Sequence, residues 1–286
     1  MKISFILSAV IVLAVRCTSG YKMVFMIHGV MSDKGSLDFL SEYIKQAHPG
    51  TEIHNMNLFA HYYSLEPIWK QVKGFKAEME KLLNNQTEEV HLIAHSQGGL
   101  IARGIIESWD NHNISSFISL SSPQAGQFGD GFLHLVFPGV VRDEAYRLFY
   151  NRIGQYTSVG NYWNDPHEQE EYRQYSKFLA PVNNEAFTDD SKRFRRNLCR
   201  LKRLVLIGGP DDGVITPWQS SQFGFYTANM TVLNVRQREG YRKDRNGLRT
   251  LDKRDALILH TFDGVQHLTW HHNITVIRQA VLPYLD

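Results

Sequence analysis

The chain has 286 residues, with 31 basic and 29 acidic side chains and two cysteines. This length suits one α/β domain or two small ones, and a hydrophobic share of 43% is typical of a folded globular protein. The near balance of charge excludes the basic stripe that nucleic-acid binding needs, so we expect no nucleic-acid partner. Two cysteines exclude a disulfide-rich scaffold and a cysteine-rich zinc module.

The first twenty residues have the pattern of a cleaved secretory signal. Lys2 precedes an apolar run from Ile3 to Val15, and cleavage is expected after Ser19 or Gly20. The run is too short to span a bilayer comfortably, which disfavours an uncleaved anchor. No later segment is long enough either, so at most peripheral contact with a membrane surface is expected. Four Asn-x-Ser/Thr sequons fit a secretory route and are possible glycosylation sites: Asn85, Asn113, Asn229 and Asn273.

The rest of the chain, residues 21–286, alternates apolar runs with longer amphipathic stretches, which is the pattern of βαβ units. We expect, in chain order, a strand at 23–27, a helix at 36–46, a strand at 52–56, a helix at 66–83, strands at 90–94 and 116–120 around a helix at 100–109, strands at 203–207 and 256–261, and a closing helix at 273–282. This predicts a single α/β domain with a mostly parallel central sheet and flanking helices.

One long interval breaks this alternation. Residues from about 126 to 199 are rich in aromatic side chains and show no clean strand and helix sequence. Such a stretch predicts short helices and loops inserted above the sheet. We therefore expect a helical cap at about 126–199.

The expected strand at 90–94 runs directly into a serine-centred turn. The residues there are Ala94-His95-Ser96-Gln97-Gly98, and a helix follows. A strand, a tight turn and a helix in this order form a nucleophile elbow, which usually reads G-x-S-x-G; here a small alanine takes the first position. The turn lifts the Ser96 hydroxyl clear of the sheet and points the start of the helix at the reacting oxygen. Ser96 is therefore the candidate nucleophile.

A serine hydroxyl needs a base to take its proton, and in this arrangement the partners follow in the order Ser, acid, His. The strand after the cap ends in Gly-Gly-Pro-Asp-Asp-Gly, so Asp212 is the expected acid and Asp211 the alternative. The last strand leads to His267, ahead of the closing helix, so His267 is the expected base. His271 and His272 are its nearby rivals.

Acyl transfer also needs hydrogen-bond donors for a developing oxyanion. The backbone N–H of Gln97, next to the candidate nucleophile, is one candidate, and that of Val30, in the loop after the first strand, is the other. We expect structural roles for His28, in that loop, and for His95. No metal or cofactor is expected, because the polar cluster around Asp165 has no second set of ligands.

Several longer strings carry a family resemblance across nearly all of the chain after the signal. They are Met26 to Gly29, His95 to Leu100, Ser119 to Gln124, and Leu206 to Gln219, the last reading Leu-Ile-Gly-Gly-Pro-Asp-Asp-Gly-Val-Ile-Thr-Pro-Trp-Gln. With these strings the chain closely resembles the palmitoyl-protein thioesterase family. It is most similar to the second branch, the lysosomal acyl-thioesterases.

The resemblance implies an α/β-hydrolase fold and a serine enzyme of the lysosome. Its implied substrates are fatty acyl thioesters, either long-chain acyl-CoA or S-acyl cysteine, cleaved through an acyl-serine intermediate. Carried over by motif, it makes Ser96 the nucleophile, Asp212 the acid and His267 the base, in agreement with the order of the residues. The alternatives are an oxygen-ester lipase or esterase, which would use the same three residues, and a non-catalytic lipid-binding protein of the same fold.

Overall fold

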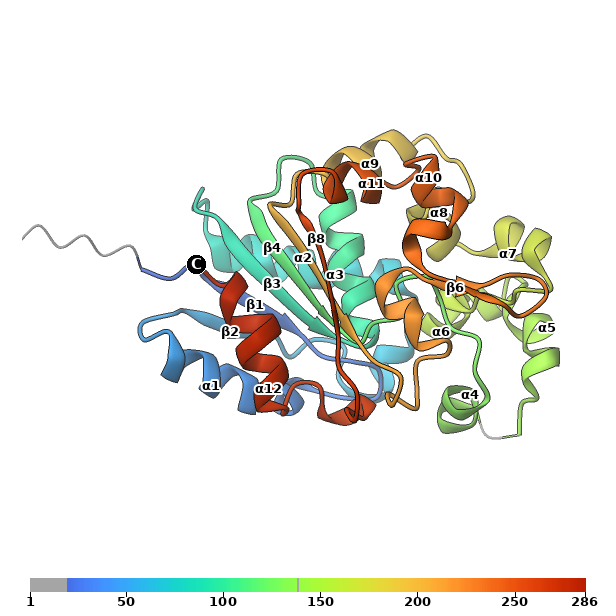
Figure 1. Ribbon diagram of the computed structural model, residues 1–286, viewed down its shortest axis with the longest axis horizontal. Helices are drawn as coiled ribbons and strands as arrows, with labels where there is room; N and C mark the ends of the chain where they lie inside the picture. The colour runs from blue at the N-terminus through green and yellow to red at the C-terminus, as the bar shows by residue number, and fades with distance from the viewer. Residues whose placement is uncertain (1–19, 138) are drawn as a thin grey trace, which may run out of the picture.

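The computed structural model describes residues 20–137 and 139–286, so the predicted signal segment lies outside the described residues apart from Gly20. At its centre is a six-stranded parallel sheet in the order β2-β1-β3-β4-β5-β8 (Figure 1). The strands of this sheet are β1 (Val24–Ile27), β2 (Ile53–Asn55), β3 (Val90–His95), β4 (Ile114–Leu120), β5 (Arg203–Gly208) and β8 (Leu257–Thr261). A separate antiparallel pair joins β6 (Phe225–Tyr226) to β7 (Val232–Leu233).

The central strands are buried on both faces. Successive side chains of a strand point to opposite sides of the sheet. In β1, Phe25 and Ile27 therefore enter the core on one side, and Val24 and Met26 enter the core on the other. Because both sides are covered, these strands read in the sequence as unbroken apolar runs rather than as alternating patterns.

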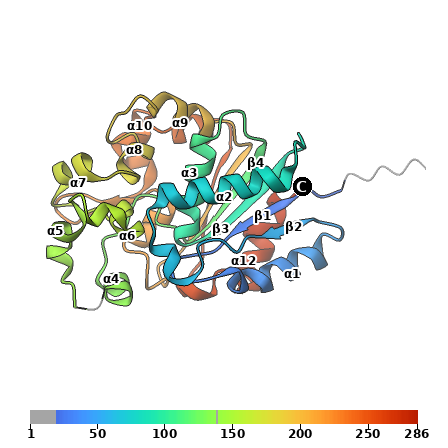
Figure 2. The same cartoon turned by 180° about the vertical axis from the view of Figure 1, so that it is seen from behind.

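Helices cover both faces of the sheet (Figures 1 and 2). One face carries α2 (Ile68–Leu83), α3 (Gln97–Ser108) and α9 (Ser191–Leu198), and the other carries α1 (Asp38–Ala47) and the closing α12 (Ile274–Val276). A parallel sheet with helices on both faces is the expected α/β architecture, and the predicted fold class is confirmed.

Between β4 and β5 the chain forms a group of short helices beside the carboxyl ends of the strands (Figure 1). We call residues 130–182 the cap; its helices are α4 (Asp130–Val136), α5 (Ala145–Phe149), α6 (Ser158–Tyr162), α7 (Gln169–Tyr175) and α8 (Leu179–Val182). The next helix, α9, packs on α3, where Asn197 donates to the carbonyl of Glu107 at 2.9 Å. Of the helices in the described part of the chain, none is long and apolar enough to cross a membrane.

The four helices predicted by range each begin one to three residues from the predicted start, and two of these shifts are informative. The helix α3 begins at Gln97 and not at Leu100. A single residue with a positive φ, Ser96, is enough to turn the chain out of β3 and into the helix. The helix α2 begins at Ile68, so Pro67 is its N-cap residue, with φ of −51° and ψ of 138°, and does not lie in the first turn. After α12, two further helical turns extend the closing segment: the π-helical Ile277–Val281 and the 3-10 turn Leu282–Tyr284.

Candidate active site

Ser96 lies at the sharp turn between β3 and α3. Its φ of 55° and ψ of −131° are strained for a non-glycine residue and are typical of a nucleophile elbow. A Cβ added to Gly98 would lie 2.5 Å from the carbonyl oxygens of Ile27 and His28, so only glycine fits at that position. This crowding comes from the end of the neighbouring strand β1.

The structure brings together the three residues named as nucleophile, base and acid. His267 begins a 3-10 turn (His267–Thr269) after β8, and its Nε2 lies 2.9 Å from the Ser96 Oγ. Its Nδ1 lies 2.9 Å from Oδ2 and 3.1 Å from Oδ1 of Asp212, and all three side chains are buried. An ionised carboxylate only accepts hydrogen bonds, so Nδ1 carries the proton and Nε2 accepts from the Ser96 hydroxyl.

The Asp212 carboxylate receives four further hydrogen bonds. The Ser121 hydroxyl donates to Oδ2 at 2.6 Å and the Trp270 indole N–H at 2.7 Å. The backbone N–H groups of Val214 and Ile215 donate to Oδ1 at 3.1 and 2.7 Å. Burial would raise the pKa of Asp212, but the hydrogen bond and charge of His267, with the other donors, lower it to about 2.

The backbone of His267 is held at both of its polar groups. Its N–H donates to the carbonyl of Asp212 at 2.9 Å, and its carbonyl accepts from Nε2 of His95 at 2.9 Å. Burial, together with the neighbouring His267 and His271, holds the pKa of His95 well below the usual range for histidine. His95 therefore stays neutral and acts on the backbone of His267, in keeping with the structural role expected for it.

The alternative acid and bases have other partners. Asp211 is exposed, and its Oδ2 accepts from the N–H of Gly264 at 2.7 Å. The rings of His271 and His272 pack on one another with centroids 4.3 Å apart, and His271 packs on His95. Within residues 20–137 and 139–286, none of these three side chains hydrogen-bonds to Ser96 or Asp212.

Both expected oxyanion donors belong to segments that border Ser96. The N–H of Gln97 is in the first residue of α3, where an amide has no acceptor within its own helix. The Gly29 carbonyl lies 2.9 Å from Nδ1 of His28, and His28 Nε2 lies 2.9 Å from the carbonyl of Leu58. Because the peptide bond is planar and trans, holding the Gly29 carbonyl on one side turns the N–H of Val30 to the other.

A cavity of about 270 Å³ opens in front of Ser96 and His267. Apolar side chains line this cavity beside Ser96 and His267. Among them are Val30, Phe132 from α4 of the cap, Val214 and Leu268. Leu268 is 72% exposed although it directly follows His267. The cavity therefore presents an apolar surface next to the nucleophilic hydroxyl.

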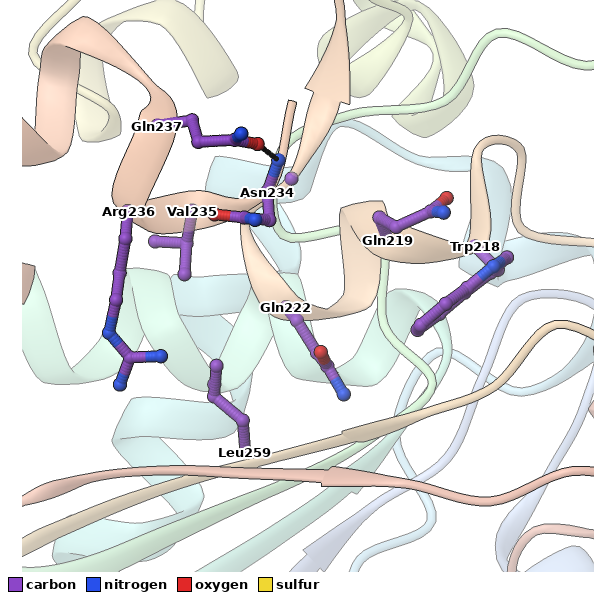
Figure 3. Close-up of a pocket in the computed structure, with 9 residues that line it drawn as sticks. Trp218, Gln219, Gln222, Asn234, Val235, Arg236, Gln237 and Leu259 are labelled. Carbon is purple, nitrogen blue, oxygen red and sulfur yellow. Dashed lines mark hydrogen bonds between the residues drawn. The ribbon is translucent and has the colours of Figure 1, made fainter. Parts of the chain in front are cut away.

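A larger cavity of about 540 Å³ lies elsewhere, against the edge strand β8 and around Trp218, Gln219 and Asn234 (Figure 3). Its lining contains none of Ser96, Asp212 and His267. Several of its polar side chains bond within the protein; for example, Gln237 accepts from the backbone N–H of Asn234 at 3.0 Å. The smaller cavity is therefore the one in which the chemistry of the site can take place.

Two side chains that support the site, Ser121 and Trp270, are not among the residues predicted from the sequence. Ser121 follows β4 at the same edge of the sheet as Ser96, so its position could have marked it. Trp270 lies three residues after His267, but nothing in the sequence indicates where its indole points.

Among the described residues, no group of three or more potential metal ligands is found. Asp165 instead accepts from the backbone N–H of His167 at 2.9 Å and forms a polar turn.

With this geometry in place, comparison with known proteins decides the family. Residues 23–267 match the family model described as palmitoyl protein thioesterase. The chain belongs to this family. It is 44% identical to the lysosomal thioesterase PPT2 homolog of Drosophila melanogaster, over 97% of this chain and 98% of that protein. It is 46% identical to lysosomal thioesterase PPT2 of Rattus norvegicus, over 93% of this chain and 88% of that protein.

The resemblance inferred from the motifs, including that to the second branch, is therefore confirmed, and the protein is a thioester hydrolase. Among solved structures, the monoacylglycerol lipase of Paleococcus ferrophilus matches with a TM-score of 0.49 and 15% sequence identity, over 93% of this chain and 96% of its own.

Proposed function

We propose that this protein hydrolyses fatty acyl thioesters through an acyl-serine intermediate. The observation that carries the proposal is the line of 2.9 Å contacts from the Ser96 hydroxyl through His267 to Asp212. Membership of the thioesterase family supports a thioester as the substrate. The contacts support Ser96 as the nucleophile, His267 as its base and Asp212 as the acid.

In the first step, Ser96 Oγ attacks the thioester carbonyl carbon while Nε2 of His267 takes the hydroxyl proton. Asp212, ionised because its pKa is about 2, stabilises the imidazolium that forms. The carbon–sulfur bond breaks, and the proton leaves with the thiol. Water, activated by the same histidine, then attacks the acyl ester, so that the fatty acid departs and the Ser96 hydroxyl is restored.

The negative charge that develops on the carbonyl oxygen needs donors that are already in position. The backbone N–H groups of Val30 and Gln97 take this role in the proposal. Both segments border Ser96, and the fixed peptide unit ahead of Val30 supports the assignment.

The acyl chain would lie against the apolar wall that includes Phe132, Val214 and Leu268. Each buried CH₂ group contributes about 0.8 kcal/mol, so this wall favours a fatty chain over a short acyl group. The thiol carrier in the proposal is coenzyme A or a cysteine side chain. The lysosome is the proposed compartment, because the related PPT2 proteins carry that word in their names and residues 1–20 predict entry into the secretory pathway.

The test compares the wild type with Ser96→Ala on a panel of acyl-CoAs and S-acylated peptides of several chain lengths, at acidic and neutral pH. We expect Ser96→Ala to abolish turnover of every thioester. Each thioester is paired with its oxygen-ester isostere, and the wild type is expected to prefer the thioester. Retained turnover by Ser96→Ala would remove the proposed mechanism, and a preference for the oxygen ester would favour an esterase.

A further inference from the structure

Ser64 contacts both segments that carry the proposed oxyanion donors. It lies in the 3-10 turn His61–Leu65 and is 1% exposed. Its hydroxyl bonds to the loop that contains Val30, and its carbonyl bonds to the side chain of Gln97. These partners lie 33 residues away from it along the chain, one on either side.

The hydroxyl of Ser64 holds the loop after β1. It accepts from the backbone N–H of Met31 at 2.7 Å and donates its own proton to the carbonyl of His61. Because its proton is used in the second bond, the oxygen faces Met31 as an acceptor. Met31 has a φ of 55°, a conformation that costs free energy for a non-glycine residue and that the Ser64 bond helps to maintain.

The carbonyl of Ser64 holds Gln97. It accepts from Nε2 of Gln97 at 2.7 Å and from Nε2 of Gln71, in α2, at 2.8 Å. The other end of the Gln97 amide accepts from the hydroxyl of Tyr162, in α6 of the cap, at 3.1 Å. The Gln97 side chain is therefore fixed at both ends, and with it the start of α3.

We propose that Ser64 is a positioning residue that sets the distance between the two oxyanion donors, the N–H groups of Val30 and Gln97. The inference rests on the proposed function, since it needs an oxyanion in this place. A misplaced donor weakens stabilisation of the transition state more than it weakens binding of the ground state. Loss of the Ser64 hydroxyl should therefore act on kcat rather than on KM.

Three substitutions at Ser64 separate its hydroxyl from its backbone carbonyl. Ser64→Ala removes the acceptor of the Met31 N–H and leaves the bond to Gln97. Ser64→Thr keeps a hydroxyl, and Ser64→Cys replaces the hydroxyl oxygen by a larger sulfur atom that is only a weak acceptor. If the alanine variant fails to fold, the threonine and cysteine variants still form a matched pair.

Ser220→Ala is the control. Ser220 is fully buried, and its hydroxyl likewise accepts from a distant backbone N–H, that of Ala125 at 3.2 Å, and donates to a carbonyl, that of Gly126 at 2.5 Å. Ser220→Ala therefore loses the same kind of side-chain bonds away from the oxyanion donors, while the Ala125 N–H keeps a 3.2 Å bond to the Ser220 backbone carbonyl. Melting temperatures of all variants show whether Ser64→Ala and Ser220→Ala are destabilised alike.

The measured quantities are kcat, KM and the affinity of a fatty acyl trifluoromethyl ketone, which adds to a nucleophilic serine and places an oxyanion in the site. For Ser64→Ala we expect kcat to fall about 10- to 100-fold, with KM changed less than about 3-fold, and inhibitor affinity to fall by a similar factor to kcat. Ser64→Thr should keep most of kcat, Ser64→Cys should lie between, and Ser220→Ala should change each quantity less than about 3-fold.

Two results would overturn the inference and leave the proposed function standing, provided that Ser96→Ala is inactive. One is a kcat for Ser64→Ala that is no lower than that of Ser220→Ala. The other is a change in Ser64→Ala that raises KM and leaves kcat unaltered. Activity in Ser96→Ala would overturn the proposed function, and this inference with it. For the cysteine and threonine pair, equal kcat values and equal inhibitor affinities would count against the role of the hydroxyl.

Discussion

At the scale of single residues, the Asp212 carboxylate decides how the site behaves in acid. Its donors are all in place in the folded chain, and they lower its pKa to about 2. A carboxylate whose pKa falls on folding contributes stability above its unfolded pKa, near 3.9, and loses that contribution as the pH falls through about 2. Asp212 therefore remains ionised, and able to hold His267, at the pH of an acidic compartment.

The two adjacent acids give a matched pair of variants. Asp212→Asn should lower kcat about 10⁴-fold, because an amide in that place favours the wrong tautomer of His267. Asp211→Asn should change kcat less than about 2-fold, since its amide oxygen can still accept from Gly264. Steady-state kinetics with one thioester substrate checks both. Equal losses in the two variants, or a larger loss in Asp211→Asn, would contradict the assignment of the acid.

Part of this site could be predicted residue by residue. Ser96 stands directly after β3, and Asp212 and His267 lie in the loops that follow β5 and β8, so the structure brings all three to the same edge of the sheet. The supporting contacts could not be predicted, because they depend on where side chains point in space. The indole of Trp270 reaches a carboxylate 58 residues away, and the Ser64 carbonyl a side chain 33 residues away.

At the scale of elements, α3 links the nucleophile to the segments on either side of the cap. Ser96 stands at its start, and a buried ion pair of Arg103 and Glu107, with 2.8 Å between Nε and Oε1, lies in its second half. Arg103 also donates to the carbonyl of Gln124 at 2.9 Å and to Asn183, just after α8, at 2.6 Å. Burial raises the pKa of Glu107 to about 7, although the charge of Arg103 opposes this.

This shift predicts that the Glu107 carboxyl group favours the folded state in acid, where it is protonated. A carboxyl group whose pKa rises on folding contributes stability that is fully present below its unfolded pKa, near 4.3, and is lost as the pH rises through about 7. The free energy of unfolding of the wild type should therefore increase relative to Glu107→Gln as the pH falls from 8 to 5, by at most about 3 kcal/mol.

Urea denaturation at several pH values measures this difference. Glu80→Gln is the control, because Glu80 makes a comparable pair with Lys76, 2.8 Å between Nζ and Oε1, on the surface of α2. It should show a much smaller pH-dependent difference. A difference for Glu107→Gln that is flat with pH, or that grows toward pH 8, would show that Glu107 stays ionised in the fold.

The strands and the long helices could be predicted because each has a strong apolar pattern of its own. The burial of Phe25 and Ile27 on one side of β1 and of Met26 on the other explains the unbroken run that marks that strand. The cap helices could not be placed individually. They are short, and contacts with distant segments hold them, such as the bond from the backbone N–H of Ile68 to Asn161 of α6 at 2.8 Å.

At the scale of the whole molecule, the four sequons lie in different surroundings. Asn85, Asn113 and Asn229 are exposed, whereas Asn273 is half-buried. The Asn273 side chain accepts from the N–H of Val276 at 3.1 Å and caps α12. A glycan needs an exposed asparagine, and the Asn273 side chain is half-buried and already caps a helix. We therefore expect Asn273 to be a poorer glycosylation site than the other three asparagines.

Expression through a secretory host should therefore give glycans at Asn85, Asn113 and Asn229, as mapped by mass spectrometry of peptides. Asn273→Gln should lower the free energy of unfolding by about 1 kcal/mol through loss of the cap, and Asn229→Gln, at an exposed position without a positive φ, should change it by less than about 0.5 kcal/mol in the unglycosylated protein. Full occupancy at Asn273 with none at the three exposed sequons would contradict this assignment.

Labelling with a hexadecyl fluorophosphonate, which reacts with an activated serine, tests directly whether Ser96 is the nucleophile. We predict one label per chain, located on the peptide that contains Ser96, with loss of thioesterase activity in proportion to the label and protection by a fatty acyl thioester. His267→Ala should slow the labelling strongly, because the Ser96 hydroxyl then lacks its base. Complete inactivation with the label on another residue, or complete labelling of Ser96 with full activity, would contradict the assignment of Ser96 as the nucleophile.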